Sequence, residues 1–292
     1  MGDLIDLSKV KPLDDIAAKK DKALLDTLTK PFNAEREKLI KKALTKPEQL
    51  SFLPTKLCRT TIFFPLPRRG RKKLQSEPIT LTFKTEWGTI EYEGRRLSVD
   101  DEDLLLVCTY LAKKEGERCF DTTFTELQKL LGIIPNSKLN PRIREAFERL
   151  GKVTFTIDYN VKGGMWSVSH IMRMRCLKGK LQVTFDKDFY DEVLKSYTLL
   201  SIPFRRRLNG DIAKLLFTFL SSHRTPATYF TDTLATALNM NQTREKKYTV
   251  RALKKGFKEL QTRGFLIHSA YDKKRDLFTI TPIEKKRWKK LK

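Results

Sequence analysis

The sequence contains few residues of the kinds that build metal or redox centres. Cysteine occurs four times and histidine three times among 292 residues. The cysteines, Cys58, Cys108, Cys119 and Cys176, form no C-x-x-C pair, and no histidine stands at metal-ligand spacing. We therefore expect no bound metal, and we interpret the cysteines as buried thiols in a reducing cytosol.

Motifs of nucleotide hydrolysis and DNA cleavage are also missing. No G-x-x-x-x-G-K-(S/T) stretch occurs, so we expect no P-loop, and no His-x-His pair of a metal-dependent nickase occurs. His170 and Arg173 match the His-x-x-Arg of tyrosine recombinases, with Tyr190 and Tyr197 downstream, but they stand in a strand-like run, whereas that chemistry needs a helix. We therefore expect a protein that is not an enzyme and that uses no cofactor.

Long apolar runs are absent, and none approaches the length of a membrane span. Asp6 stands where N-terminal acylation needs a serine or threonine, and no signal-peptide pattern occurs. The sequence predicts neither a membrane anchor nor secretion, and we expect a cytoplasmic protein without a membrane partner.

Acidic residues are scarce relative to basic ones. The chain has 35 aspartates and glutamates against 59 lysines and arginines, which gives a net charge of +24. This balance favours a polyanionic partner. Nucleic acid is the first choice, with ribosomal, membrane-surface and heparin-like partners as alternatives.

One segment, residues 243–263, has the pattern of an amphipathic helix with a cationic face. Its apolar residues recur at steps of three and four, which places them on one stripe. They are Val250, Leu253, Phe257 and Leu260. Basic residues recur at the same steps on the opposite face and form a ridge that suits phosphates. They are Arg244, Lys247, Arg251, Lys255 and Lys258.

The elements expected around this segment indicate a winged helix. A helix follows Asn209 and ends near residues 221–224, and Thr231 begins a shorter helix. After the basic helix, Gly264 precedes two strand-like runs, residues 265–270 and 277–280, that flank the turn at Lys273 and Lys274. In a winged helix the third helix enters the major groove and the hairpin lies beside it.

The same order is expected earlier in the chain. Residues 100–114, 124–131 and 141–150 predict three helices, and residues 153–159 alternate, turn at 162–164 and return through 168–176 as a hairpin. We infer a second winged helix that arose by internal duplication. Glutamates dilute the arginines of its third helix, so protein contacts or backbone clamping by Arg173 and Arg175 suit it better than base reading.

Two charged runs have alternative interpretations. Asp100, Asp101, Glu102 and Asp103 suggest either a metal site or acids that complement a helix dipole, and we favour the second. The basic run at residues 68–73 either touches phosphates or is a solvated loop.

Residues 49–53 form a glutamine followed by a compact apolar cluster, namely Gln49, Leu50, Ser51, Phe52 and Leu53. This stretch resembles the short peptides by which replication proteins dock on the sliding clamp. Such peptides generally end in Leu-Phe, whereas Phe52 precedes Leu53 here. The alternative is a linker whose Leu50 and Phe52 fold back on the first domain.

Several motifs resemble those of TrfA-type plasmid replication initiators. They are residues 208–224 with Phe-Leu-Ser-Ser-His-Arg at 219–224, Glu259-Leu260 leading to residues 264–268, residues 53–59, Ile62-Phe63 and residues 99–103. The resemblance covers roughly residues 50–269. It implies a bacterial protein that binds direct repeats (iterons) of plasmid origin DNA and melts an adjacent AT-rich region. It also implies a monomer and dimer equilibrium and contacts with host DnaA, the replicative helicase and the sliding clamp. Single-stranded DNA of the melted region is a further partner that we consider.

The sequence thus predicts an α+β fold with tandem winged helices behind a mobile N-terminal arm. We place the arm, which is either partly helical or disordered, at residues 1–48, the first domain at 49–205, the second at 206–284 and a basic tail at 285–292. The rival function is a winged-helix transcriptional repressor that binds operator DNA. The residues expected to bind DNA are Arg224, Arg244, Lys247, Tyr248, Arg251, Lys254, Lys255, Lys258, Lys273, Lys274, Arg173 and Arg175.

Overall fold

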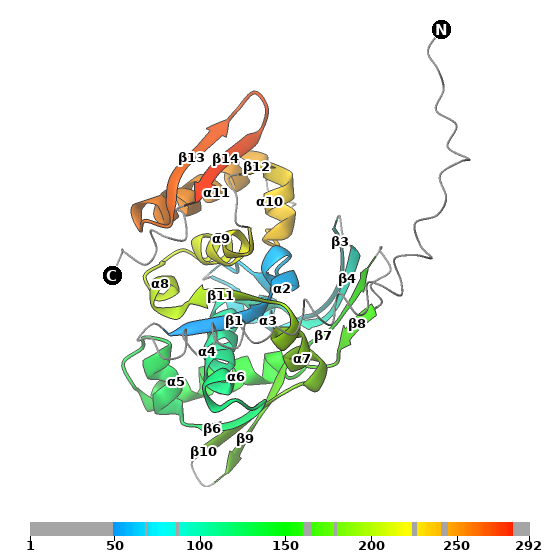
Figure 1. The fold of residues 1–292 in the computed structure, drawn as a ribbon, viewed down its shortest axis with the longest axis vertical. Helices are drawn as coiled ribbons and strands as arrows, with labels where there is room; N and C mark the ends of the chain where they lie inside the picture. Colours follow the sequence, from blue (N-terminus) through cyan, green and yellow to red (C-terminus); the bar gives the residue numbers. More distant parts are fainter. Residues whose placement is uncertain are drawn as a thin grey trace, which may run out of the picture. The chain divides into compact units, whose positions relative to one another are not determined.

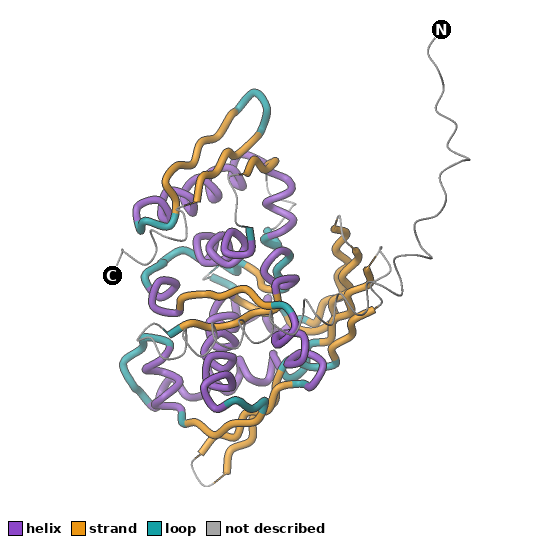
Figure 2. The backbone as a smooth tube through the Cα atoms, in the orientation of Figure 1, coloured by secondary structure: helices purple, strands orange, loops and turns teal. Residues whose placement is uncertain are grey.

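The computed structural model describes residues 49–67, 69–85, 88–159, 165–177, 180–223, 227–240 and 245–282. All of them belong to one unit, Gln49–Lys292, and Met1–Glu48 form another. The arm predicted at residues 1–48 and the tail at 285–292 therefore lie outside the described residues. The expected α+β class is confirmed, since the described chain contains both helices and strands, with several strands following one another directly (Figures 1 and 2).

Two stretches of the chain have the same order of elements. The first repeat contains α4 (Val99–Glu115), β6 (Cys119–Thr122), α5 (Phe124–Leu130), η2 (Ser137–Leu139), α6 (Asn140–Leu150), β9 (Met172–Leu177) and β10 (Lys180–Phe185), and two further strands, β7 (Thr154–Tyr159) and β8 (Met165–Val168), interrupt it between α6 and β9. The second repeat contains α9 (Asp211–Ser222), β12 (Ala227–Phe230), α10 (Thr231–Ala237), α11 (Lys246–Thr262), β13 (Leu266–Asp272) and β14 (Leu277–Pro282). Their sheets have the corresponding strand orders, β6-β10-β9 and β12-β14-β13. The two repeats thus share a topology, and their origin by internal duplication stays a prediction.

The hairpin of the first repeat is not the one that the sequence predicted. Strand β7 (Thr154–Tyr159) does pair with β8 (Met165–Val168), but both belong to a separate sheet with β3 (Pro78–Thr85) and β4 (Gly88–Arg95), in the order β3-β4-β7-β8. The expected return strand at 168–176 is wrong because Ile171 and Met172 are both fully buried. Consecutive buried residues break the period of two, and the chain changes sheets there.

Short elements connect these parts. They are β1 (Leu50–Pro54), α2 (Thr55–Arg59), β2 (Phe63–Phe64), α3 (Arg71–Ser76), β5 (Leu97–Ser98), α7 (Lys187–Lys195), β11 (Tyr197–Ser201) and α8 (Ile202–Arg206). Strands β1 and β11 pair antiparallel, and Figure 1 shows them between the helices of the first repeat and α9. Strands β2 and β5 pair in parallel.

Aromatic side chains fill the core on both sides of this connection. Phe185 of β10 in the first repeat stacks on Phe189 of the connecting helix α7, with ring centroids 5.9 Å apart. In the second repeat Phe217 meets Phe265 edge to face at 5.1 Å. Burial of such rings is a main source of the fold's stability. Among the described helices, none has the length and apolar character needed to cross a membrane.

Candidate nucleic-acid interface

Helix α11 buries one face against α9. Leu253, Phe257 and Leu260 are at most 2% exposed, as the apolar stripe predicted, whereas Val250 is half-buried. A side chain at Gly256 would meet Leu216 of α9, because a Cβ there would lie 2.8 Å from the Leu216 Cδ1 atom. The glycine therefore lets the two helix backbones approach closely, which fixes how α11 is presented.

The opposite face of α11 is exposed and cationic. Its exposed residues are Lys246, Lys247, Tyr248, Arg251, Lys254, Lys255 and Lys258. Lys247 pairs with Glu245 at 2.5 Å, while no described residue forms an ion pair with Arg251, Lys255 or Lys258. Unpaired cations along one helix face suit a row of phosphates.

The hairpin β13–β14 stands beside α11. The Nζ atom of Lys254 lies 4.4 Å from the centroid of the Tyr271 ring of β13, which joins the hairpin to the helix by a cation–π contact. Lys273 and Lys274 are exposed in the hairpin turn, where Asp272 Oδ1 accepts from the backbone N–H of Lys274 at 2.8 Å. The structure thus brings the predicted residues of α11 and of the hairpin turn together on one repeat.

Asp276, the last residue before β14, connects three elements through its carboxylate. Thr231 Oγ1 donates to it at 2.6 Å from α10, Tyr271 OH donates at 2.8 Å from β13, and Lys246 Nζ of α11 lies 2.6 Å away. These contacts hold the pKa of Asp276 below its usual value, although partial burial opposes them. Sequence reasoning missed this residue, because an aspartate in a turn has an ordinary local explanation.

The cations of the first repeat are arranged differently. Arg149 of α6 does not face solvent, since its guanidinium donates to Asp101 at 2.7 and 3.1 Å. Arg144 is exposed and lies 5.1 Å from the Phe124 ring. Arg173 and Arg175 are exposed on β9, opposite Thr184 and Gln182 of β10. These arginines therefore lie on the hairpin of the first repeat, although that hairpin differs from the predicted one.

The acidic start of α4 joins the two repeats. Glu102 and Asp103 accept from Arg205 of α8 at 2.8 and 2.5 Å, and Lys214 of α9 lies 2.5 Å from Asp103. Thr218 of α9 donates to Glu102 at 2.8 Å. We expected these acids to complement the dipole of α4. Glu102 and Asp103 have an additional role, because they bind side chains of α8 and α9. Within the described chain, no group of His, Cys, Asp and Glu side chains is placed to hold a metal ion.

The stretch that resembles a clamp peptide is a strand. Phe52 and Leu53 are 0% and 1% exposed in β1, and Ser51 Oγ donates to the carbonyl of Leu106 at 2.6 Å. The exposed linker assumed for this peptide is therefore contradicted, while the folded-back alternative fits. Gln49 and Leu50 at its edge are half-buried. Docking of this peptide in a clamp pocket would require β1 to leave β11.

Two predicted contact residues, Arg224 and Arg244, lie outside the described residues. His223, beside the first of them, has a structural role at the C-terminal end of α9, since its Nδ1 lies 2.9 Å from the carbonyl oxygen of Phe219. Burial lowers the pKa of His223.

The recombinase-like pair, His170 and Arg173, does not lie on a helix. His170 precedes strand β9, and Arg173 lies within it, whereas recombinase chemistry needs the pair on a helix.

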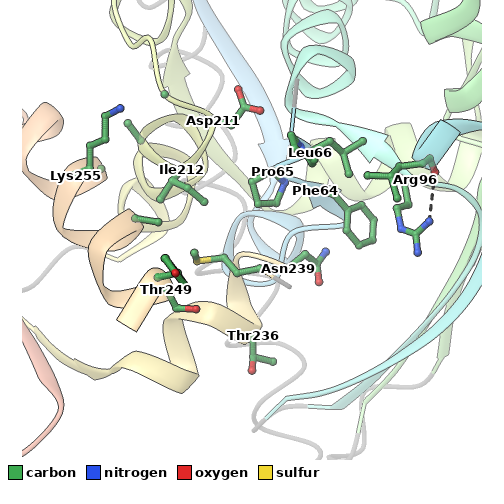
Figure 3. A pocket seen from close by; sticks show the side chains of 18 of the residues that line it. Phe64, Pro65, Leu66, Arg96, Asp211, Ile212, Thr236, Asn239, Thr249 and Lys255 are labelled. Atoms are coloured by element: carbon green, nitrogen blue, oxygen red, sulfur yellow. Dashed lines mark hydrogen bonds between the residues drawn. The ribbon is translucent and has the colours of Figure 1, made fainter. Parts of the chain in front are cut away.

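A cavity of about 780 Å³ borders the cationic face of α11. Tyr248, Thr249 and Lys255 of α11 line one side. Figure 3 shows Lys255 and Thr249 on one wall, Phe64, Leu66 and Arg96 on the other, and Asp211 and Ile212 between them. The cavity therefore separates α11 from the part of the chain that carries α3 and β3.

The sequence is similar to that of a known protein family. The family model described as TrfA protein matches residues 13–278. The plasmid replication initiator protein TrfA of Escherichia coli is 25% identical over 231 residues, which are 76% of this chain and 60% of that protein. The chain thus spans less than two thirds of the length of this relative.

Solved structures of another protein share the fold. Two crystal structures of domains 2 and 3 of RctB match with TM-scores of 0.58 and 0.52 at 13% identity. They cover 78% of this chain and 98% and 97% of their own chains. Because the family model spans most of the sequence, the chain belongs to the TrfA family of plasmid replication initiators.

Proposed function

We propose that the chain binds direct repeats in plasmid origin DNA through two winged helices and thereby initiates replication. The observation that carries the proposal is the exposed face of α11, where Arg251, Lys255 and Lys258 have no described ion-pair partner and a basic hairpin turn stands alongside. Helix, strand, two helices and hairpin is the order of a winged helix, whose third helix enters the major groove.

The two repeats have different tasks in this proposal. Helix α11 reads bases, with Arg251 suited to a bidentate contact with guanine. Arg173 and Arg175 on β9 clamp the phosphate backbone, because α6 presents glutamates beside its exposed arginines and directs Arg149 inward. Phosphate contacts position a protein on DNA without reading sequence. The proposed domain boundary, near residues 205 and 206, lies at the ion-pair network of Arg205.

Initiation further requires strand opening in the neighbouring AT-rich region. The sequence has no P-loop motif, so the free energy of DNA binding drives opening in this proposal, without catalysis by the chain. Single-stranded DNA, host DnaA, the replicative helicase and a second copy of the chain are the proposed further partners. A cytoplasmic, nucleoid-associated location follows from such partners.

The test uses the full chain, because α8 and the second repeat both make buried contacts with α4. Affinity for direct repeats taken from the DNA beside the gene is compared with affinity for the same bases in scrambled order, at one salt concentration. We expect tighter binding to the repeats by a factor of about 1,000 or more. Equal affinities would refute sequence-specific binding.

The rival function is a transcriptional repressor, which would bind the same DNA without opening it. Permanganate reactivity of thymines in the AT-rich region of a supercoiled origin plasmid separates the two functions. An initiator makes these thymines reactive, whereas a repressor leaves them protected. A covalent protein–DNA adduct in the same reaction would instead indicate a cleaving enzyme.

A further inference from the structure

Helix α3 is a surface helix that contributes no buried residue to the core. Its six residues read Arg-Lys-Lys-Leu-Gln-Ser. A helix this short is marginal by itself, so contacts with the rest of the chain must hold it in place. What it presents to solvent is therefore a better guide to its role than what it buries.

One face of α3 is fixed by polar contacts. Arg71 donates to Asp100 at 2.6 Å and to Asp211 at 3.0 Å, and the Gln75 amide lies 3.3 Å from Asp101. Arg96 reaches the carbonyl of Leu74 at 3.3 Å. Residues 71, 74 and 75 are spaced by three and four positions, so they share the attached face.

The other face of α3 carries unpaired cations. Lys72 and Lys73 are exposed, as is Arg69 just before the helix, and no described residue forms an ion pair with either lysine. Exposed lysines that form no ion pair within the described chain can bind an anion of another molecule. The sequence had left this run open between a phosphate contact and a solvated loop.

The position of α3 relates these lysines to α11. Glu259 of α11 accepts from the backbone N–H of Asn209 at 2.5 Å, and Asp211, two residues later, binds Arg71. The C-terminal half of α11, the loop before α9 and α3 are therefore consecutive neighbours. Figure 3 shows the same order across the cavity, from Lys255 past Asp211 to Leu66 and Arg96.

We propose that Lys72 and Lys73 bind the phosphate backbone of duplex DNA that extends beyond the repeat read by α11. The inference rests on the proposed function, because the C-terminal half of a reading helix lies near the backbone where the DNA leaves the groove. The partner is B-form DNA of any sequence. Asp100 and Asp211, which approach Arg71, neutralise that arginine and leave the two lysines as the contact.

The test compares the full chain with Lys72→Ala/Lys73→Ala on two duplexes. One duplex ends at the repeat, and the other is longer by about one helical turn, roughly 10 base pairs, on each side. We expect equal affinities of the two proteins for the short duplex. On the long duplex the variant should bind about tenfold more weakly and show a salt slope smaller by about two units, one for each lost phosphate contact.

Lys152→Ala/Lys187→Ala is the matched control, since both lysines are exposed and the change in charge is the same. It should bind both duplexes as the parent does, and circular dichroism spectra of all proteins should coincide. Equal binding of parent and Lys72→Ala/Lys73→Ala to the long duplex would overturn the proposal. Failure of the parent to prefer the repeat over scrambled DNA would instead refute the proposed function.

Discussion

The guanidinium Nη2 of Arg205 donates to Glu102 Oε2 at 2.8 Å, and both side chains are almost fully buried, at 3% and 0% exposure. Removal of one partner of such a pair leaves an uncompensated buried charge, which costs about 3–5 kcal/mol. We therefore expect Arg205→Met to lower the free energy of unfolding by this amount. Urea unfolding followed by circular dichroism measures it.

The neighbouring Arg206 is exposed and provides the control. Arg206→Met should change the free energy of unfolding by no more than about 0.5 kcal/mol. Burial already raises the pKa of Glu102, and Arg205 opposes that rise. Arg205→Met removes this opposing charge, so Glu102 takes up a proton more readily as the pH falls. The difference in free energy of unfolding between the parent and Arg205→Met should therefore shrink at low pH. Similar unfolding of the two variants would show that the pair is not a link between the repeats.

Phe52 tests whether residues 49–53 are a strand of the core or a detachable peptide. The side chain is fully buried and meets the Tyr197 ring edge to face at 5.2 Å. Phe52→Ala should therefore lower the free energy of unfolding by about 3–5 kcal/mol. Gln49→Ala, at the half-buried edge, should have little effect. If both variants unfold like the parent while clamp binding is lost, the peptide acts as a free docking motif.

His223 makes stability depend on pH. Burial lowers its pKa below the ordinary value of 6.5, while its contact with the Phe219 carbonyl opposes the shift. The unfolded chain then binds the proton more readily, so stability should fall as the pH drops through about 6.5. Thermal unfolding at several pH values should show a flatter dependence for His223→Gln than for the parent. His268→Gln, at an exposed histidine, should retain the parent's dependence.

The sequence predicted the secondary structure most accurately where the hydrophobic periodicity of one segment decides it. The basic helix expected at residues 243–263 is observed as Lys246–Thr262, since its apolar stripe packs on α9 and Gly264 adopts the left-handed conformation that ends it. The exposure of its cations followed from the same stripe. Helical periodicity and a helix stop are both encoded within the segment itself.

Features that depend on distant partners were not predictable in this way. Arg205 meets Glu102 across 103 residues, and nothing near either residue distinguishes the pair from surface charges. The buried strand β1 and an exposed docking peptide have similar compositions, because both need a compact apolar cluster. Strand β9 was assigned to the wrong hairpin, since alternation identifies a strand but not the neighbour with which it pairs.

Arg251 and Lys258 separate base reading from backbone positioning on α11. Both are exposed, but Arg251 lies in the N-terminal half of the helix and Lys258 in the C-terminal half. Arg251→Ala should cost about 1–3 kcal/mol of binding and relax preference at one or two base positions. Lys258→Ala should weaken all sites alike and lower the salt slope by about one unit. The measurement is the affinity of each protein for a panel of DNA sites with single-base changes, at several salt concentrations. If Lys258→Ala alters base preference and Arg251→Ala weakens all sites alike, α11 lies in the groove in a different pose.

Asp276 provides a test in which geometry and net charge predict opposite results. Loss of a carboxylate near DNA should strengthen binding if only charge matters, because less negative charge faces the phosphates. The carboxylate, however, is held by Thr231, Tyr271 and Lys246, so it fixes the hairpin and the start of α11 relative to each other. We therefore expect Asp276→Asn to bind its repeat at least about fivefold more weakly, which corresponds to about 1 kcal/mol.

Asp272→Asn, in the same hairpin turn, is the matched control because it changes the net charge equally but leaves the contact with α11 intact. Its affinity should equal or exceed that of the parent. Affinity for random duplex should be unchanged or higher in both variants, so only Asp276→Asn should lose its preference for the repeat. A hairpin that acts through charge alone would give the two variants the same gain in affinity, and the carboxylate of Asp276 would then have no part in orienting α11.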